Sequence, residues 1–198
     1  MSSMPAKIIE LEDMIPKLYQ DQIENTANAL PWYFHPDSAS GDLKFKAAHS
    51  GFYHMAYDFS ESNPVTSAIN AILVPVLFIF CDKAGIPFQK LFRVRLGLFN
   101  RTMVDVEHHN PHVDFTDPHR VALYYVNDSD GATVVFNETV DDVSREQSAR
   151  YASERRFTEL GRFEPRKGRM ISFDGRHYHA SMHPRAHESR IVVTFNFR

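Results

Sequence analysis

The sequence has little of what several classes of protein require. Its 198 residues include one cysteine, Cys81, so no disulfide can form within the chain. Because Cys81 lies in an apolar run, we expect a buried, unreactive thiol and a reducing, cytoplasmic setting. A closed zinc site built on thiolates is disfavoured, and the Gly-x-Ser-x-Gly motif of serine hydrolases does not occur.

Strong net charge and long apolar runs are also lacking. The formal net charge of −3 provides no field that would attract nucleic acid or an anionic membrane, so we expect neither as a partner. The longest apolar run, residues 71–81, is too short to cross a hydrocarbon layer of ~30 Å as a helix. The composition, 43% hydrophobic and 24% charged, predicts one compact domain over residues 1–198.

The first part of the chain carries helical patterns and loops. Apolar residues at helical spacing predict a helix over residues 11–30, which a proline ends. A second helix should begin at residues 62–64, Ser-Asn-Pro, and end at Gly85, with a kink or a break at Pro75. Residues 31–63 between them are expected to form loops and one or two short strands.

Strands dominate after residue 88. Alternating or β-rich runs predict strands over residues 92–96, 121–126, 132–136, 170–173 and 190–198, with a hairpin turn at 128–131. The charged stretch 137–162 is predicted to be partly helical and is interpreted as a solvated surface excursion rather than a lid. Helices followed by strands predict the α+β class, with helices that buttress a β-sandwich or barrel.

Histidines are concentrated in two short segments. Four of the eleven lie in residues 108–119 and four in residues 177–187. In an extended segment His112 and Asp114 point to the same side, where an imidazole and a carboxylate can bind one metal ion. If the register of this segment were shifted, His108 or His109 could take the place of His112 as a ligand. Neither of them has a carboxylate two positions later.

The last strand supplies a second signal. One of its faces is entirely apolar, whereas the other begins with Arg190 and includes Thr194. An arginine aimed into a β-cavity needs an anionic partner, and its planar group suits a carboxylate. His179 lies 11 residues before Arg190 and is preferred as the second histidine ligand over His177 and His183.

Two histidines and one carboxylate with open coordination positions suit Fe(II) and oxygen chemistry. His112, Asp114 and His179 are therefore the predicted metal ligands and catalytic centre. The remaining positions could take O₂ and a bidentate 2-oxo acid, whose far carboxylate Arg190 would bind.

The C-terminal half resembles the 2-oxoglutarate- and Fe(II)-dependent dioxygenase superfamily, particularly its prolyl-hydroxylase-like branch with small bacterial and phage members. The matching segments are residues 112–114, 121–127, 131–136, 168–173, His179 and 190–195. This resemblance implies a double-stranded β-helix, or jelly roll, over residues 88–198, supported by helices and loops of residues 1–87. It also implies Fe(II), 2-oxoglutarate and O₂ as cofactor and co-substrates, with succinate and CO₂ as products of hydroxylation.

Further residues are assigned to the co-substrate site. Either Tyr124 or Tyr125 should enter the cavity, since adjacent strand residues point to opposite faces, and Tyr124 is preferred. Thr194 and Asn127 are further candidates for contact with 2-oxoglutarate. Arg93 and Arg95 share one strand face, for which a solvated edge is favoured over binding of an anionic substrate.

Two other functions stay open. A cupin-type metalloenzyme on a similar barrel would use three histidines and no deep arginine, and a non-catalytic module could hold a metal alone. For an oxygenase, the substrate could be a peptidyl proline, an amino acid or another small metabolite. The sequence does not determine the substrate or the oligomeric state.

Overall fold

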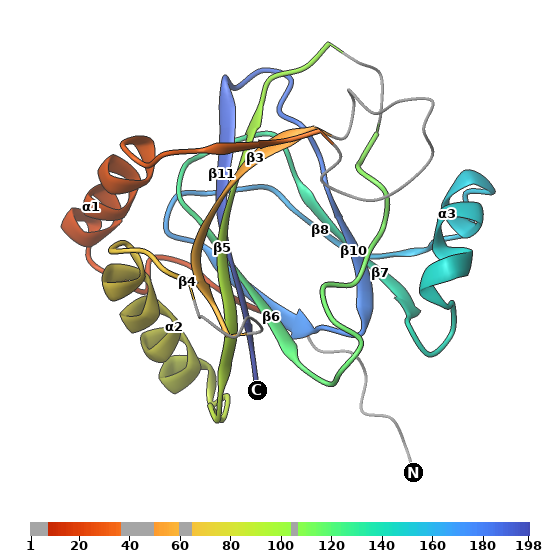
Figure 1. The fold of residues 1–198 in the computed structure, drawn as a ribbon, viewed down its shortest axis with the longest axis horizontal. Helices are drawn as coiled ribbons and strands as arrows, with labels where there is room; N and C mark the ends of the chain where they lie inside the picture. Colours follow the sequence, from red (N-terminus) through yellow and green to blue (C-terminus); the bar gives the residue numbers. More distant parts are fainter. Residues whose placement is uncertain (1–7, 37–49, 60–64, 104–106) are drawn as a thin grey trace.

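The computed structural model describes residues 8–36, 50–59, 65–103 and 107–198 (Figure 1). From N- to C-terminus the elements are β1 (Ile9–Leu11), α1 (Lys17–Asn28), β2 (Tyr33–His35), β3 (Gly51–Asp58), β4 (Val65–Thr66), α2 (Asn70–Ala84), β5 (Leu91–Asn100), β6 (Arg120–Tyr125), β7 (Thr133–Thr139), α3 (Arg145–Ser153), β8 (Glu159–Phe163), β9 (Met170–Asp174), β10 (His177–Ser181) and β11 (Ser189–Phe197).

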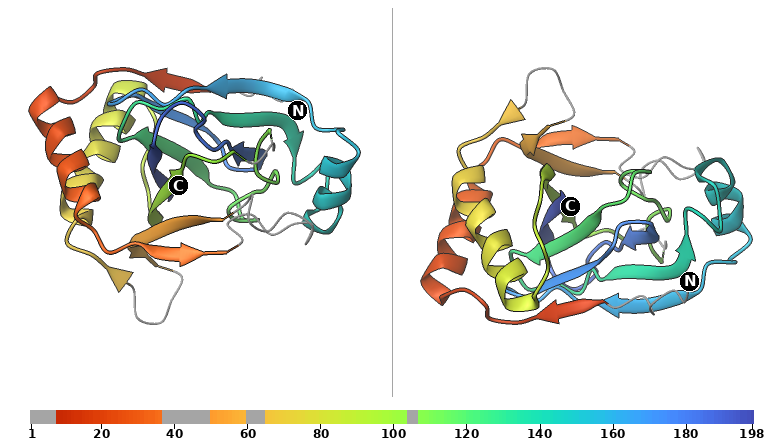
Figure 2. Two further views of the ribbon diagram at one scale, coloured as in Figure 1. Left: turned by 90° about the horizontal axis from the view of Figure 1, so that it is seen from above. Right: turned by 90° about the horizontal axis from the view of Figure 1, so that it is seen from below.

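The strands form two antiparallel sheets. The larger sheet has the order β1-β9-β6-β11-β5-β3-β2, with β4 paired to β3, and the smaller has the order β10-β7-β8. Helices α1 and α2 lie side by side at one end of the molecule, and α3 lies at the other (Figures 1 and 2). These observations confirm the predicted α+β class.

Three apolar clusters hold the layers together. Between α1, α2 and the larger sheet, buried side chains include Ile23, Leu77 and Phe80. A second cluster joins the two sheets, and a third covers the smaller sheet beneath α3. The two sheets therefore pack against each other through apolar side chains, and the space that remains between them can house a site.

Strand β11 shows why its sequence folds in this way. Its four apolar alternate residues all join the cluster beneath the helices: Ile191, Val193, Phe195 and Phe197. The period of two then turns Arg190, Val192 and Thr194 toward the cavity between the sheets, as predicted. β11 therefore separates the helical support from the site.

The N-terminal segment differs from the prediction. The helix expected over residues 11–30 begins only at Lys17, because Ile9–Leu11 form β1, which pairs with β9. Leu18 belongs to the predicted apolar stripe but is exposed, whereas Gln20 is buried and donates to the Ile15 carbonyl oxygen. The buried face of this helix therefore includes a hydrogen-bonded glutamine, and Leu18, which the apolar periodicity predicted to be buried, lies on the surface.

The second helix also starts later than predicted. Its expected cap at residues 62–64 lies outside the described residues, and Val65–Thr66 pair with β3 as the strand β4. Helix α2 then continues through Pro75 as a single helix, so the alternative of two shorter helices is wrong. Gly85 ends it in the left-handed conformation, with φ of 64°, as predicted.

Two expectations about connectivity are also corrected. Residues 128–131 do not close a hairpin, because β6 belongs to the larger sheet and β7 to the smaller one. The sheet does not begin near residue 88, since β1, β2, β3 and β4 extend it at both edges. The stretch 137–162 contains α3, so its predicted partial helicity is confirmed.

No helix in the described part of the chain is long and apolar enough to cross a membrane.

Candidate metal centre and co-substrate pocket

The predicted metal ligands converge. One potential ligand atom from each of His112, Asp114 and His179 lies within 4.8 Å of the other two. The two histidines come from segments that exchange backbone hydrogen bonds of 3.0 Å in both directions, and their ring centroids are 4.6 Å apart. This bridge at the β10 edge of the smaller sheet brings together residues that are 67 positions apart.

Backbone carbonyls fix the orientation of both imidazoles. Nδ1 of His112 lies 3.3 Å from the Asn110 oxygen, and Nδ1 of His179 lies 3.2 Å from the His177 oxygen. A carbonyl only accepts, so Nδ1 carries the proton and Nε2 keeps its lone pair for a metal ion. Burial lowers the pKa of His112 and lowers the pKa of His179 to about 3. Both rings are therefore neutral at physiological pH, as metal ligation requires.

Asp114 is held by two side chains from the larger sheet. Arg93 on β5 lies 2.7 Å from its Oδ1, and Asn196 on β11 donates to its Oδ2 over 2.8 Å. Arg93 also donates to the amide oxygen of Asn196, which closes the three residues into a ring. Burial by itself would raise the pKa of Asp114, but the guanidinium of Arg93 holds it well below its usual value.

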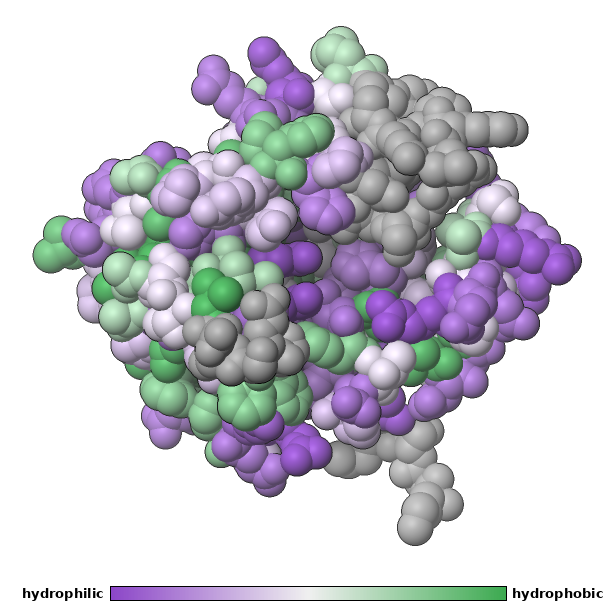
Figure 3. All heavy atoms as spheres, in the orientation of Figure 1, coloured by the Kyte–Doolittle hydropathy of each residue, from purple (hydrophilic) through white to green (hydrophobic). Residues whose placement is uncertain are grey.

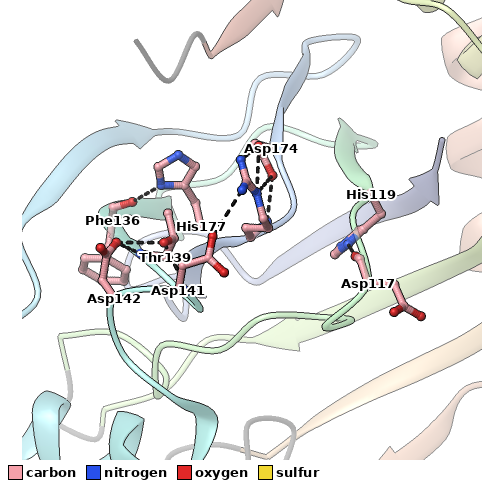
Figure 4. Close-up of polar contacts among 9 residues, drawn as sticks. Asp117, His119, Phe136, Thr139, Asp141, Asp142, Asp174 and His177 are labelled. Atoms are coloured by element: carbon pink, nitrogen blue, oxygen red, sulfur yellow. Dashed lines mark hydrogen bonds and ion pairs between the residues drawn. The ribbon is translucent and has the colours of Figure 1, made fainter. Parts of the chain in front are cut away.

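The competing histidines do not join the metal ligands. Nδ1 of His177 lies 2.9 Å from the Phe136 oxygen, and a register shift in β10 separates its position from that of His179 (Figure 4). His119 directs Nδ1 to the Asp117 oxygen. His109 packs its ring against Phe99 at 4.8 Å.

Two further histidines direct Nδ1 to backbone oxygens. Nδ1 of His108 lies 2.6 Å from the His109 oxygen, and Nδ1 of His183 lies 2.9 Å from the Asn100 oxygen. Within the described ranges, the only group of three or more possible metal ligands is the one predicted.

Arg190 has an unusual environment. It is fully buried, its Nη2 donates to the Thr133 hydroxyl over 2.7 Å, and its guanidinium lies 5.5 Å and 5.9 Å from the ring centroids of Phe99 and Tyr125. Its Nε and Nη1 are buried without a hydrogen-bond partner among the described residues. Burial lowers its pKa to about 10, so the group stays charged at physiological pH. An unpaired buried cation is costly, so this pocket is suited to an anion that accepts two hydrogen bonds.

The structure corrects the choice between the two tyrosines. Tyr125 donates its hydroxyl to Thr133 over 2.9 Å, so it shares an acceptor with Arg190. Tyr124 points the other way, into the cluster beneath α1 and α2. Alternation along β6 correctly predicted that the two tyrosines point to opposite faces of the strand. Tyr124 lies on the face that packs beneath the helices.

The other two predicted pocket residues are placed differently from each other. Thr194 lines the cavity two positions before Asn196. Asn127 instead uses its amide on the backbone: Nδ2 donates to the Ser189 oxygen and Oδ1 accepts from the Ile191 amide. Asn127 thus fixes the start of β11 around Arg190 and does not line the cavity.

Asp130 fastens the turn that leads into β11. Its carboxylate accepts hydrogen bonds from the backbone amides of Arg185, Ala186 and His187, at 2.9 to 3.1 Å. These bonds hold its pKa far below the usual value although burial opposes them. The connection between β10 and β11 is therefore tied to the connection between β6 and β7.

The three candidate metal ligands and Arg190 line one cavity of about 70 Å³ between the sheets. Its wall also includes Tyr53, Arg95, Leu123 and Thr133. Hydrophilic residues gather near the middle of the face in Figure 3, between the helical layer and α3. The site is thus a small chamber with a partly apolar wall, lined by the candidate metal ligands and by two arginines.

Neither a protein-family model nor the sequence of a curated protein matches this chain. Solved structures do. A 2OG-Fe(II) oxygenase from Burkholderia pseudomallei is 14% identical, with a TM-score of 0.67 over 96% of this chain and 84% of its own. HygX from Streptomyces hygroscopicus, with nickel and 2-oxoglutarate bound, is 12% identical, with a TM-score of 0.63 over 97% and 82%. A prolyl-4-hydroxylase from Pseudomonas putida is 11% identical, with a TM-score of 0.55 over 98% and 94%.

The chain has the fold of the 2-oxoglutarate- and Fe(II)-dependent oxygenases. This confirms the double-stranded β-helix that the resemblance implied, in which two sheets face each other.

Three supporting residues were missed from sequence alone. Arg93 was interpreted as part of a solvated edge, but it is mostly buried and paired with Asp114. Thr133 and Asn196 received no role, although both bond a predicted site residue. The available signal was the alternation of β5, which places Arg93 on one face, opposite Asn196 in the pairing with β11.

Proposed function

We propose that this protein is a 2-oxoglutarate- and Fe(II)-dependent dioxygenase that hydroxylates an unactivated C–H bond. In the overall reaction, O₂, 2-oxoglutarate and the substrate give succinate, CO₂ and the hydroxylated product. One oxygen atom enters succinate and the other enters the new hydroxyl group.

One combination of features carries the proposal. Three neutral or anionic ligand groups meet at one end of a buried cavity, and a guanidinium with two unmatched donors lines the same cavity. Such a cavity fits a metal ion and an acid that binds through both of its ends. 2-Oxoglutarate has a 2-oxo acid group at one end and a carboxylate at the other, which matches both requirements.

The residues have separable roles. Nε2 of His112, Nε2 of His179 and a carboxylate oxygen of Asp114 would hold Fe(II). When bound, Fe(II) would supply the oxygen activation that no side chain can perform. Arg190 would bind the distal carboxylate of 2-oxoglutarate, and Tyr125 and Thr133 would hold the guanidinium in place. Thr194 borders the space between these ends and would contact the chain of the acid.

The alternative functions are supported less well. A cupin-type enzyme that does not use 2-oxoglutarate gives no reason for the unmatched donors of Arg190. A non-catalytic metal-binding module would not need a cavity that connects the ligands with a buried cation. Both alternatives explain the histidines and leave the arginine unexplained.

The substrate is proposed as a class. Structural relatives include HygX with hygromycin B bound and a Trichoplax adhaerens prolyl hydroxylase in complex with a peptide fragment. A peptidyl proline, an amino acid or another small metabolite would each be compatible with the fold. The cytoplasmic location and the single-domain organisation stay predictions.

The decisive test is anaerobic crystallography of the protein with Mn(II) and 2-oxoglutarate. We expect Mn(II) on His112, Asp114 and His179, and the distal carboxylate of 2-oxoglutarate on Arg190. In solution, the iron-loaded protein should form succinate only when both O₂ and 2-oxoglutarate are present. Metal bound without 2-oxoglutarate, together with no succinate formation, would favour the cupin-type or non-catalytic alternative.

A further inference from the structure

A second arginine, Arg95, also lines the cavity. It lies on β5, where it pairs with Thr194 of β11 on one side and with Met55 of β3 on the other. It shares the cavity wall with Tyr53 and Asp114. The same cavity is lined by His112 and His179, so Arg95 faces the space into which the candidate metal ligands point.

Arg95 differs from its neighbour on the same strand face. Arg93 is paired with Asp114 at 2.7 Å, whereas no ion pair or hydrogen bond joins the Arg95 side chain to any described residue. Arg95 is only partly accessible to solvent. A half-buried guanidinium that faces a cavity without a partner is suited to a ligand.

The balance of charge in the occupied cavity leads to the same conclusion. Asp114 is the only carboxylate among the described lining residues, and Arg93 neutralises it. A divalent metal ion and a 2-oxoglutarate dianion would cancel each other. The charges of Arg95 and Arg190 would then remain in a space of low dielectric, which favours a further anion.

We propose that the substrate of this enzyme carries an anionic group, a carboxylate or a phosphate, which Arg95 binds beside the metal centre. The inference rests on the proposed oxygenase function and narrows its substrate class. Tyr53 lies beside Arg95 in the cavity wall and can donate its hydroxyl to the same anion. The C–H bond that reacts would then lie within a few bonds of the anionic group, because Arg95 and the candidate metal ligands line the same cavity.

A direct test uses selenate, a tetrahedral oxyanion that anomalous scattering can locate. Crystals of the protein with Mn(II) and 2-oxoglutarate would be soaked in sodium selenate. We expect selenium at the Arg95 guanidinium in the natural protein and none there in Arg95→Gln. An empty Arg95 beside bound 2-oxoglutarate on Arg190 would overturn the inference and leave the oxygenase function intact. Absence of Mn(II) and 2-oxoglutarate from the cavity would count against the oxygenase function itself.

Solution measurements separate the two kinds of anion. Succinate formation would be measured with small carboxylic acids beside their primary amides, and with phosphate monoesters beside their parent alcohols. We expect stimulation only by charged members, and the reactive series identifies carboxylate or phosphate. Neutral members that stimulate as well as their charged counterparts would contradict the proposal.

Variants then assign the effect to Arg95. In Arg95→Gln the concentration of the acid for half-maximal stimulation should rise on the order of 30-fold, whereas Arg95→Lys should recover part of the loss. The Kd for 2-oxoglutarate, measured by calorimetry, should not change. Arg150→Gln removes one charge from the exposed surface of α3 and serves as the matched control. A weakened affinity for 2-oxoglutarate in Arg95→Gln would instead assign this arginine to the co-substrate.

Discussion

Two buried arginines of this protein have opposite surroundings. Arg169 lies at the edge of the larger sheet, where it contacts Glu10 and Glu12 of the N-terminal segment and donates to the Glu164 oxygen. All three of its guanidinium nitrogens have partners. Arg190 lies in the cavity, where it donates to the Thr133 hydroxyl and faces the rings of Phe99 and Tyr125, and two of its buried nitrogens have no hydrogen-bond partner among the described residues.

The contrast distinguishes a charge that the fold pairs with its own anions from a charge that it leaves without one. The ion pairs of Arg169 fasten β1 to the remainder of the sheet, so the folded chain itself supplies its anions. Among the described residues no carboxylate pairs with Arg190, so a ligand can provide the anion. Unsatisfied donors at a buried charge are therefore better evidence for a site than burial alone.

The most direct test of this difference between Arg169 and Arg190 is to replace each arginine with methionine. Arg190→Met should weaken 2-oxoglutarate binding by about 30-fold or more, because a desolvated charge pair contributes ~2–5 kcal/mol. The metal-free variant should be at least as stable as the natural protein, since it loses an unpaired buried charge. Calorimetric titration and urea denaturation measure the two effects.

Arg169→Met is the matched control and should behave in the opposite way. Its urea midpoint should fall, because Glu10 and Glu12 lose their partner, and its affinity for 2-oxoglutarate should stay unchanged. If both variants lose stability and neither loses affinity, the two arginines are alike and the comparison is wrong.

The second prediction concerns the other end of the cavity. Asp114→Ala should lower the affinity for Fe(II) or Mn(II) by about 100-fold or more, because it removes a ligand and leaves Arg93 unpaired beside the metal. Metal content after dialysis measures the effect. Asp141→Ala removes an exposed carboxylate and should retain the metal. Equal retention by both variants would remove Asp114 from the ligand set.

Acidic pH should destabilise the metal-free protein through the cavity histidines. Unfolded histidine titrates near 6.5, whereas burial lowers the pKa of His179 to about 3 and also lowers that of His112. Between these values the unfolded chain binds more protons, so the free energy of unfolding should fall as the pH drops below about 6.5. Above that pH the two histidines contribute no dependence.

Urea denaturation at a series of pH values tests this expectation. His179→Phe should show a shallower decline between pH 6.5 and 4 than the natural protein. Asp114 acts in a separate range, since its lowered pKa affects stability only below about 3.8. An equally steep decline in the variant would indicate that other groups cause the acid sensitivity.

The smallest effect should separate the two adjacent tyrosines. Tyr125→Phe removes the hydrogen bond to Thr133 and should raise the KM for 2-oxoglutarate about fivefold, the equivalent of ~1 kcal/mol. Tyr124→Phe should leave this KM unchanged, because its ring packs beneath the helices. The reverse result would restore the assignment of Tyr124 to the cavity.

Much of the site could be predicted because strand geometry is simple. A period of two placed His112 beside Asp114 and separated Arg190 from the apolar residues of β11. The order of elements predicted the fold class, and Gly85 marked the end of α2. Each of these depends on residues close together in the sequence.

The errors arose where distant segments decide the outcome. Alternation separates Tyr124 from Tyr125, but the packing of α1 and α2 determines which face is covered. The turn at 128–131 has hairpin residues, yet its flanking strands enter different sheets because each finds other partners. Arg93 looked exposed until β5 lay beside β11 and brought it to Asp114.

The hydrogen bonds that Asp130 accepts from the amides of residues 185–187 have a consequence for the entropy of ligand binding. Because its carboxylate already orders the turn before β11, the guanidinium of Arg190 is attached to a backbone that has little freedom left to lose. When a ligand binds such a preorganised group, the entropy lost in ordering the protein is smaller, so the binding free energy is more favourable. Asp130, which is not among the residues that line the cavity, can in this way strengthen the binding of an anion at Arg190.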